Sequence, residues 1–334
     1  MQFGTVPLDQ ADGAILAHSV ALPGGGRLRK GLRLTPEALA QIRAAGHGVV
    51  TVARLEGGDV HEDAAAMYLA TALVPDPAAA GLELRAVGTG RVNIHANGCG
   101  VADVNGARIH AVNGVDPMIS VATVAPWHRM AAGDMVATVK IIAYGVGATA
   151  LQAACDAGDS ALQLHVPVIH SATLIQSVNE GDSGDKGHRV LQQRLAALSV
   201  TLAPPVLVAH EQTALCEAIT AARDSPLILI LTASATSDPG DVAPQALRDA
   251  GGVVVRFGMP VDPGNLLFIG HLGAVPVIGL PGCVKSPALN GADWVMERLI
   301  CGVPVTSGDI AAMGVGGLLK EIPTRPHPRE PRQP

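Results

Sequence analysis

Aromatic side chains are scarce in this chain. Only 2% of its 334 residues are Phe, Trp or Tyr, whereas 48% are hydrophobic. Cores with so few rings must be filled by Val, Leu, Ile and Ala, and a chain of this length has enough of these residues for two or three domains. The composition therefore predicts a multidomain soluble enzyme or binding protein.

Cysteines, long apolar runs and excess charge are also lacking. The cysteines are odd in number and form no C-x-x-C pair, so we expect them to be reduced. They are Cys99, Cys155, Cys216, Cys283 and Cys301. No apolar run is long enough to cross a bilayer and no signal pattern opens the chain, which predicts a cytoplasmic protein without a membrane partner. A net charge of -6, spread along the chain, argues against a nucleic-acid partner.

The first part of the chain, residues 1–150, has the pattern of a mixed α+β region with one or two lobes. Thr35 and Pro36 are a cap and a first helical residue, and the helix they begin should end near Ala45. A second helix is expected from Asp59 to about Leu73. Short alternating strands with Gly and Asn turns follow, and a helical stretch over residues 143–161 is expected to link this region to the next.

Two groups of charged residues in this region have more than one explanation. Asp59, His61, Glu62 and Asp63 could bind a divalent metal, but acids at the start of a helix also complement its dipole, and we favour the helix. Lys140 stands in an apolar strand, so it either reaches an edge or faces an acidic partner. The basic residues around a triple-glycine turn fit an anion contact or an exposed hairpin equally well; they are Arg27, Arg29 and Lys30.

Strands and helices alternate from about Gln163 onwards, which predicts a mostly parallel sheet with helices on both faces. We therefore expect a three-layer αβα domain over residues 160–322. The remaining segment, 323–334, is rich in proline and charge and is expected to be a disordered tail. The predicted fold class is thus α/β, with a strand-rich α+β region in front.

Three polar or glycine-rich inserts in this second domain each follow an apolar run short enough to be a strand. The first begins at Thr232 after the run LILIL, the second spans Val261 to Asn265, and the third begins at Pro281. Because loops at the carboxyl ends of parallel strands meet at one edge of a sheet, these inserts should gather there and bind an anion. The third also leads into an amphipathic stretch, residues 287–299, whose start should offer free N–H groups.

These inserts resemble three motifs of the molybdopterin-binding domain that molybdopterin adenylyltransferases and molybdopterin molybdotransferases share. The family has T-x-G-G-x-S-x-G-x-x-D, then P-G-K-P, then L-P-G-N-P-x-S, and the three blocks follow in the same order here. The matching residues are Thr232, Ser237, Gly240 and Asp241 in the first block, Pro263 and Gly264 in the second, and Leu280, Pro281, Gly282 and Ser286 in the third.

The chain departs from the family pattern at four places. Ser234 and Ala235 replace the glycine pair. Asp262 and Asn265 stand where molybdotransferases have two lysines. The segment 170–173, H-S-A-T, corresponds to the family's T-G-D-E block and lacks both carboxylates. Lys285, in the third insert, would replace the missing lysines as a cation at the phosphate end of a ligand. The start of a helix repels cations, so a lysine close to it needs a partner, and an anionic ligand would be one.

The resemblance implies a role for each matched residue, and each role has a plainer alternative. Asp241 would position a metal or a phosphoryl or molybdate group, or would cap a helix, and the two roles can hold together. Asp238, the second candidate metal ligand, is more typical of a turn. Asp241 and Lys285 are the candidate catalytic residues. The candidate cofactor-binding residues are Thr232, Ser234, Thr236, Ser237, Gly240, Pro263, Gly264, Pro281, Gly282 and Ser286.

Segments of the first region resemble the front part of molybdopterin-binding proteins associated with xanthine-oxidase-type molybdenum hydroxylases. They are D-G-A-I-L-A-H-S, L-R-K-G-L-R-L-T, G-D-V-H-E-D-A-A-A and M-V-A-T-V-K-I-I. The resemblance implies a protein of molybdenum cofactor biosynthesis or maturation that binds molybdopterin or its adenylylated form, and we favour a molybdotransferase-like enzyme. A molybdotransferase would use Mg²⁺, ligate molybdate and release AMP.

Alternative functions remain open at this point. One is a non-catalytic molybdopterin carrier or insertion chaperone, whose partner would be an apo molybdenum hydroxylase. A weaker alternative is a nucleotide pyrophosphatase of the competence-damage-inducible type. Related proteins are dimers or trimers, and a region with many short strands has edges that favour a homo-oligomer.

Overall fold

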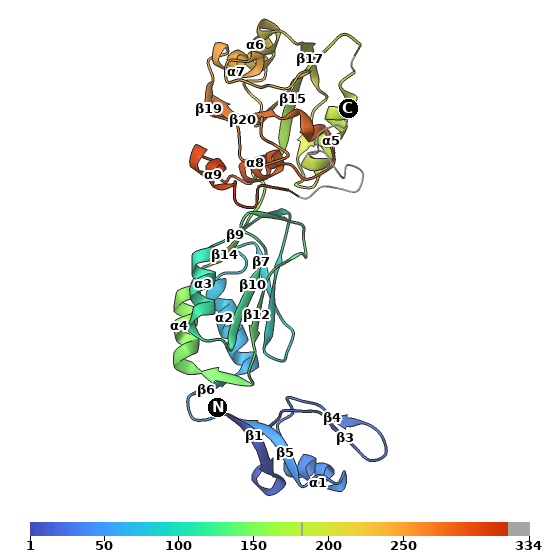
Figure 1. The fold of residues 1–334 in the computed structure, drawn as a ribbon, viewed down its shortest axis with the longest axis vertical. Helices are drawn as coiled ribbons and strands as arrows, with labels where there is room; N and C mark the ends of the chain where they lie inside the picture. Colours follow the sequence, from blue (N-terminus) through green and yellow to red (C-terminus); the bar gives the residue numbers. More distant parts are fainter. Residues whose placement is uncertain (182, 320–334) are drawn as a thin grey trace, which may run out of the picture. The chain divides into compact units, whose positions relative to one another are not determined.

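The computed structural model describes residues 1–181 and 183–319, so the expected tail at 323–334 lies outside the described residues. The chain forms two compact units (Figure 1). Unit 1 comprises Met1–Gly98 and Ala102–Leu164, and unit 2 comprises Cys99–Val101 with the chain from His165 onwards. The boundary differs from the expected 150/160 because α4 (Ala148–Gly158), expected as a linker, packs against α2 (Glu62–Leu73) and α3 (Gly106–Val115) inside unit 1.

Unit 1 contains two hydrophobic cores. The first lies between α1 (Pro36–Ala44) and a sheet with the strand order β1-β5-β2, and Leu16, Ile42 and Val52 are buried in it. As expected, the Thr35 hydroxyl caps α1 by accepting the Ala38 N–H. The strands and the short 3-10 helix of this part are β1 (Gln2–Pro7), η1 (Leu8–Gln10), β2 (Ile15–Leu16), β3 (Val20–Ala21), β4 (Arg27–Leu28) and β5 (Val49–Arg54).

The second core of unit 1 joins α2, α3 and α4 to a sheet with the order β10-β12-β8-β7. The helix expected from Asp59 begins at Glu62, because Asp59–His61 forms β6 and His61 is the N-cap. Lys140 has the acidic partner that was one of its two explanations, since its Nζ lies 3.4 Å from Glu62 Oε2. The strands here are β6 (Asp59–His61), β7 (Leu82–Ala86), β8 (Arg91–Ala96), β9 (Gly100–Val104), β10 (Ile119–Thr123), β11 (His128–Met130), β12 (Met135–Ile141), β13 (Gly145–Gly147) and β14 (Leu162–His165).

Unit 2 is built on a seven-stranded sheet with the order β16-β15-β18-β21-β20-β19, in which β17 also pairs with β15. The pairs from β16 to β21 are parallel, whereas β20 runs antiparallel to both β21 and β19. The predicted mostly parallel sheet is therefore confirmed. Its strands are β15 (Ser171–Val178), β16 (Thr201–Leu202), β17 (Val206–Ala209), β18 (Ile228–Leu231), β19 (Val253–Phe257), β20 (Phe268–Leu272) and β21 (Val275–Leu280).

Helices cover both faces of this sheet, which gives the expected three layers. On one face α6 (Gln212–Ala221) and α7 (Val242–Asp249) lie side by side (Figure 1) and share a core with Ile228, Ile230 and Val277. On the other, Gly187 of α5 (Asp185–Ala196) lies against Leu231, the neighbour of Ile230 that points to the opposite face. An ion pair joins α5 to α8 (Gly291–Ile300), and α9 (Ser307–Ala312) follows.

All five cysteines are free thiols. Burial raises the pKa of Cys301, just after α8, to about 12, so this thiol stays protonated and unreactive at neutral pH. In residues 1–181 and 183–319, no helix combines the length and apolar character that a bilayer crossing requires.

Candidate functional site

The strand register of unit 2 brings the three inserts together. Leu231 and Leu280 are parallel partners at the carboxyl ends of β18 and β21, so the loops that begin at Thr232 and Pro281 are neighbours. Phe268 pairs with both Gly279 and Phe257, so the connection 258–267 between β19 and β20 leaves the sheet at the same edge. We call this the carboxyl edge. Such edges are where open α/β sheets commonly bind ligands.

The first loop is folded back onto the sheet by its threonines and by Ser177 of β15. The Thr232 hydroxyl donates to Ser234 O at 2.6 Å, so its oxygen accepts from the Thr236 hydroxyl at 3.2 Å. The Ala233 N–H donates to Ser177 Oγ at 3.1 Å. Thr232 and Thr236 are buried, so both stabilise the loop, while Ser234 and Ser237 are exposed.

The two aspartates of the first loop bind backbone amides. Asp241 is the N-cap of α7: Oδ1 accepts the Val242 N–H at 2.7 Å and Oδ2 accepts the Ser237 N–H at 3.0 Å. Asp238 Oδ1 accepts the Gly240 N–H at 2.7 Å. The helix-cap explanation of Asp241 and the turn explanation of Asp238 are therefore confirmed.

The second loop is packed against the start of α8. Pro263 O accepts the Gly291 N–H at 2.9 Å, and a Cβ on Gly264 would lie 2.9 Å from that nitrogen. Gly264 also has a φ of +144°, a backbone conformation that favours glycine. Asn265, at a position where the family has lysine, donates from Nδ2 to Met259 O. Pro263 and Gly264 thus shape the edge through close packing.

The third loop differs from the expectation at its helix. A short 3-10 turn, η2 (Gly282–Lys285), follows Pro281, and α8 begins at Gly291 and not at residue 287. The α8 N-terminus does not offer free N–H groups, because Asn290 and Asp293 form a capping box on it and both side chains are buried. The premise that Lys285 stands at a helix start was therefore wrong. Lys285 is half-buried, and its ammonium has no acceptor among residues 1–181 and 183–319.

Arg194 of α5 holds the third loop, a role that no sequence pattern indicated. Its side chain, 11% exposed, forms an ion pair with both carboxylate oxygens of Asp293. It also donates to the carbonyl oxygens of Val284, Ser286 and Ala288. One buried guanidinium therefore fixes the backbone that carries Ser286 and Lys285.

His210 is a second residue that sequence reasoning missed. It follows β17, and its Nδ1 lies 2.9 Å from Ser177 Oγ while its Nε2 lies 2.8 Å from Ser234 Oγ. The imidazole thereby connects the ends of β15 and β17 to the first loop. A polar residue directly after a predicted strand was the only available signal.

The segment 170–173 does not belong to this edge. Thr173 pairs with Ile228, the first residue of β18, so the segment lies at the amino end of the strands. The aligned T-G-D-E block was therefore misplaced, since the carboxyl end of β15 leads instead into a segment with Glu180 and Asp185.

A magnesium site at Asp241 and Asp238 does not fit the donor set. Both Asp241 oxygens and one Asp238 oxygen accept backbone N–H groups. In the described part of the chain, no group of three or more His, Cys, Asp and Glu side chains could hold a metal ion. In the cluster around His61, His61 itself is the N-cap of α2, as the helix explanation expects.

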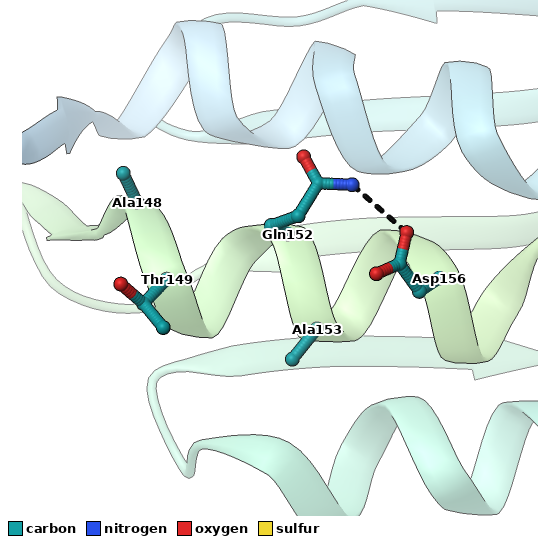
Figure 2. A pocket seen from close by; sticks show the side chains of 5 residues that line it. All are labelled: Ala148, Thr149, Gln152, Ala153 and Asp156. Atoms are coloured by element: carbon teal, nitrogen blue, oxygen red, sulfur yellow. Dashed lines mark hydrogen bonds between the residues drawn. The ribbon is translucent and has the colours of Figure 1, made fainter.

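A pocket of about 520 Å³ lies elsewhere, on the exposed face of α4 in unit 1 (Figure 2). Its lining residues come from this one helix, and a hydrogen bond from Gln152 Nε2 to Asp156 Oδ1 runs along it. They are Ala148, Thr149, Gln152, Ala153 and Asp156. The pocket includes no predicted site residue.

Three solved structures of low sequence identity resemble this chain. A family described as a domain of unknown function (DUF8806) matches residues 5–54, and no curated protein matches the chain. The structure of the molybdopterin biosynthesis moea protein from Pyrococcus horikosii is 13% identical in sequence. The match covers 90% of this chain and 75% of that protein, with a TM-score of 0.32. The structure of molybdenum cofactor biosynthesis protein B is 14% identical in sequence, and the match covers 41% of this chain and 92% of that protein with a TM-score of 0.29. The structure of the molybdopterin biosynthesis moeA protein from Pyrococcus horikoshii OT3 is 9% identical, and the match covers 83% of this chain and 69% of that protein with a TM-score of 0.22. Likeness at this level establishes neither the family nor the activity.

Proposed function

We propose that the carboxyl edge of unit 2 binds molybdopterin or its adenylylated form, and that the protein acts in molybdenum cofactor biosynthesis or maturation. The observation that carries the proposal is the register of Leu231 with Leu280 and of Phe268 with Gly279. Through it, three blocks that resemble family motifs are neighbours in space.

The polar groups of the edge suit the phosphate end of such a ligand. The backbone N–H groups of Ser234, Ala235 and Thr236 have no acceptor within residues 1–181 and 183–319. Gly282 is exposed and has no atom within 4 Å of the position of a Cβ, so a ligand can approach this backbone closely. Lys285 supplies a positive charge in the third loop. Together these groups offer hydrogen-bond donors and a cation to an anion.

Between a molybdotransferase and a carrier, the contacts of the matched aspartate, Asp241, favour the carrier. A transferase that polarises a phosphoanhydride through a metal needs a carboxylate directed at that metal, and both oxygens of Asp241 accept backbone N–H groups, those of Ser237 and Val242. We therefore infer a molybdopterin carrier or insertion chaperone, with an apo molybdenum hydroxylase of the xanthine-oxidase type as its recipient. In this account Asp241 keeps the first loop closed on α7.

Purification of the full chain from a host that makes the cofactor tests the proposal. Oxidation of the released ligand should give a fluorescent pterin, and protein from a host that cannot make the cofactor should give none. Incubation with adenylylated molybdopterin, molybdate and Mg²⁺ should release no AMP above a protein-free control. Absence of pterin would contradict the binding proposal, whereas catalytic AMP release would contradict only the carrier.

A further inference from the structure

We infer that Ser177, His210 and Ser234 form a one-way chain of hydrogen bonds, which fixes the Ser234 hydroxyl as a donor to an acceptor oxygen of the ligand. The inference deepens the proposed function, because it assigns the polarity of one contact in the same site. The chain has four groups in sequence: the Ala233 N–H, Ser177 Oγ, the His210 ring and Ser234 Oγ.

The direction follows from Ser177. Its side chain is 1% exposed, so its hydroxyl hydrogen needs a protein acceptor. The Ala233 N–H can only donate to Ser177 Oγ, which leaves His210 Nδ1, at 2.9 Å, as the one acceptor of that hydrogen in the described structure. Nδ1 is therefore the unprotonated nitrogen of the neutral ring, and the proton is on Nε2.

The consequence appears at the exposed end of the chain. With its proton on Nε2, His210 donates to Ser234 Oγ across 2.8 Å. The Ser234 hydroxyl then keeps its own hydrogen for a group outside the protein. The free N–H groups of Ser234, Ala235 and Thr236 have the same polarity, since they too can only donate. His210 is thus a positioning residue, and the contact selects a ligand atom that accepts.

Two kinds of ligand oxygen have this chemistry: a phosphoryl oxygen and a ring carbonyl oxygen. Glu211 and Asp238, exposed acids next to His210 and in the first loop, oppose a multiply charged group at this point and favour a neutral carbonyl. An oxyanion contact would instead rely on the backbone N–H groups. The experiment therefore has one arm for each source.

Nitrogen-15 NMR of the full chain labelled at histidine tests the direction without any ligand. The ring signals of His210 are assigned by their loss in His210→Gln. We expect Nε2 to be the protonated nitrogen and Nδ1 the unprotonated one. A proton on Nδ1 would reverse the chain, make His210 an acceptor from Ser234, and overturn the inference. This result does not depend on whether the protein binds a pterin.

The ligand arms use inorganic phosphate and free pterin as probes. At least one should shift the His210 Nε2 signal in the native chain and in Ser171→Ala, a matched change at the amino end of β15, but not in Ser234→Ala. His210→Leu should bind the effective probe about tenfold more weakly. His210→Gln should restore binding, because a carboxamide can accept from Ser177 and donate to Ser234 at similar spacing. Shifts that persist in Ser234→Ala, or no shift with either probe, would overturn the inference.

Discussion

At the scale of single residues, Asp241 shows how a structural role and a site role meet in one side chain. One carboxylate oxygen caps α7 and the other holds the amide of Ser237 in the first loop. Asp241→Ala removes both contacts, whereas Asp241→Asn keeps one acceptor for the cap. The two variants therefore separate helix stability from loop conformation.

We expect Asp241→Ala to lower the free energy of unfolding by about 1 kcal/mol, the usual loss of an N-cap. Pterin affinity should also fall, because the freed Ser237 amide lets the loop move. Asp241→Asn should keep most of the stability and still bind more weakly. Urea denaturation and equilibrium binding measure the two effects. Equal affinity in all three proteins would remove Asp241 from the site.

Lys285 is a cation with no described protein partner beside the loops, which is the arrangement expected of a ligand contact. Lys285→Ala should weaken phosphate or pterin binding, and added salt should reduce the difference in affinity from the native chain, because salt screens a charge that is partly open to solvent. Binding titrations of both proteins at low and moderate ionic strength measure this salt dependence of the affinity. Lys30→Ala, at an exposed lysine of unit 1, is the charge-matched control. An effect of Lys285→Ala equal to that of the control would contradict the role.

At the scale of elements, the third loop depends on α5 and not only on its own sequence. Arg194→Met would leave Asp293 as a buried charge without a partner, a change that costs about 3–5 kcal/mol. We expect a large loss of stability in unit 2, measured by chemical denaturation. Arg189→Met changes an exposed arginine of the same helix and is the matched control. If both variants unfold alike, the buried ion pair does not determine the loop.

Two glycines of the neighbouring segments should respond in opposite ways. A Cβ on Gly279 of β21 would lie 1.8 Å from the Phe268 ring, so Gly279→Ala should destabilise unit 2 by about 1–3 kcal/mol through overpacking. Gly282→Ala meets open space and should fold as the native chain does, while a methyl group there should reduce ligand affinity. Thermal unfolding and binding assays together check both. Normal stability of Gly279→Ala, or normal affinity of Gly282→Ala, would contradict this packing.

The sequence predicted the elements of unit 2 better than their ends. Uninterrupted apolar runs such as 227–231 identified buried strands, and alternation with helices predicted their parallel order. The start of α8 was missed because the amphipathic stretch was expected to begin at residue 287, whereas Asn290 and Asp293 form the actual cap. Such a cap competes with alternatives that lie only a few residues away, and tertiary packing decides between them.

The contacts that complete the site could not be predicted from the sequence. Arg194 and Asp293, or Ser177, His210 and Ser234, come from different elements, and nothing local distinguishes them from solvent-exposed polar residues. Their partners are determined by the register of β15, β17 and β18. The candidate residues of the three loops, by contrast, were found because each directly follows a strand.

At the scale of the whole molecule, the chain has two units, and the candidate site lies in one of them. Unit 1 has its own cores and the pocket on α4, while every candidate cofactor-binding residue lies in unit 2. The central claim is therefore that a pterin is bound at one edge of one sheet. That claim concerns location as well as affinity.

The most direct test measures how much pterin the purified chain contains after a change at either edge of this sheet. The full native chain, Ser237→Ala at the carboxyl edge and Ser171→Ala at the amino edge are purified from the same cofactor-producing host, oxidised, and compared by pterin fluorescence per chain. The account predicts pterin in the native chain and in Ser171→Ala, and several-fold less in Ser237→Ala, since loss of a binding hydroxyl costs about 1 kcal/mol or more. Equal pterin in all three proteins, or a loss confined to Ser171→Ala, would contradict a site at the carboxyl edge.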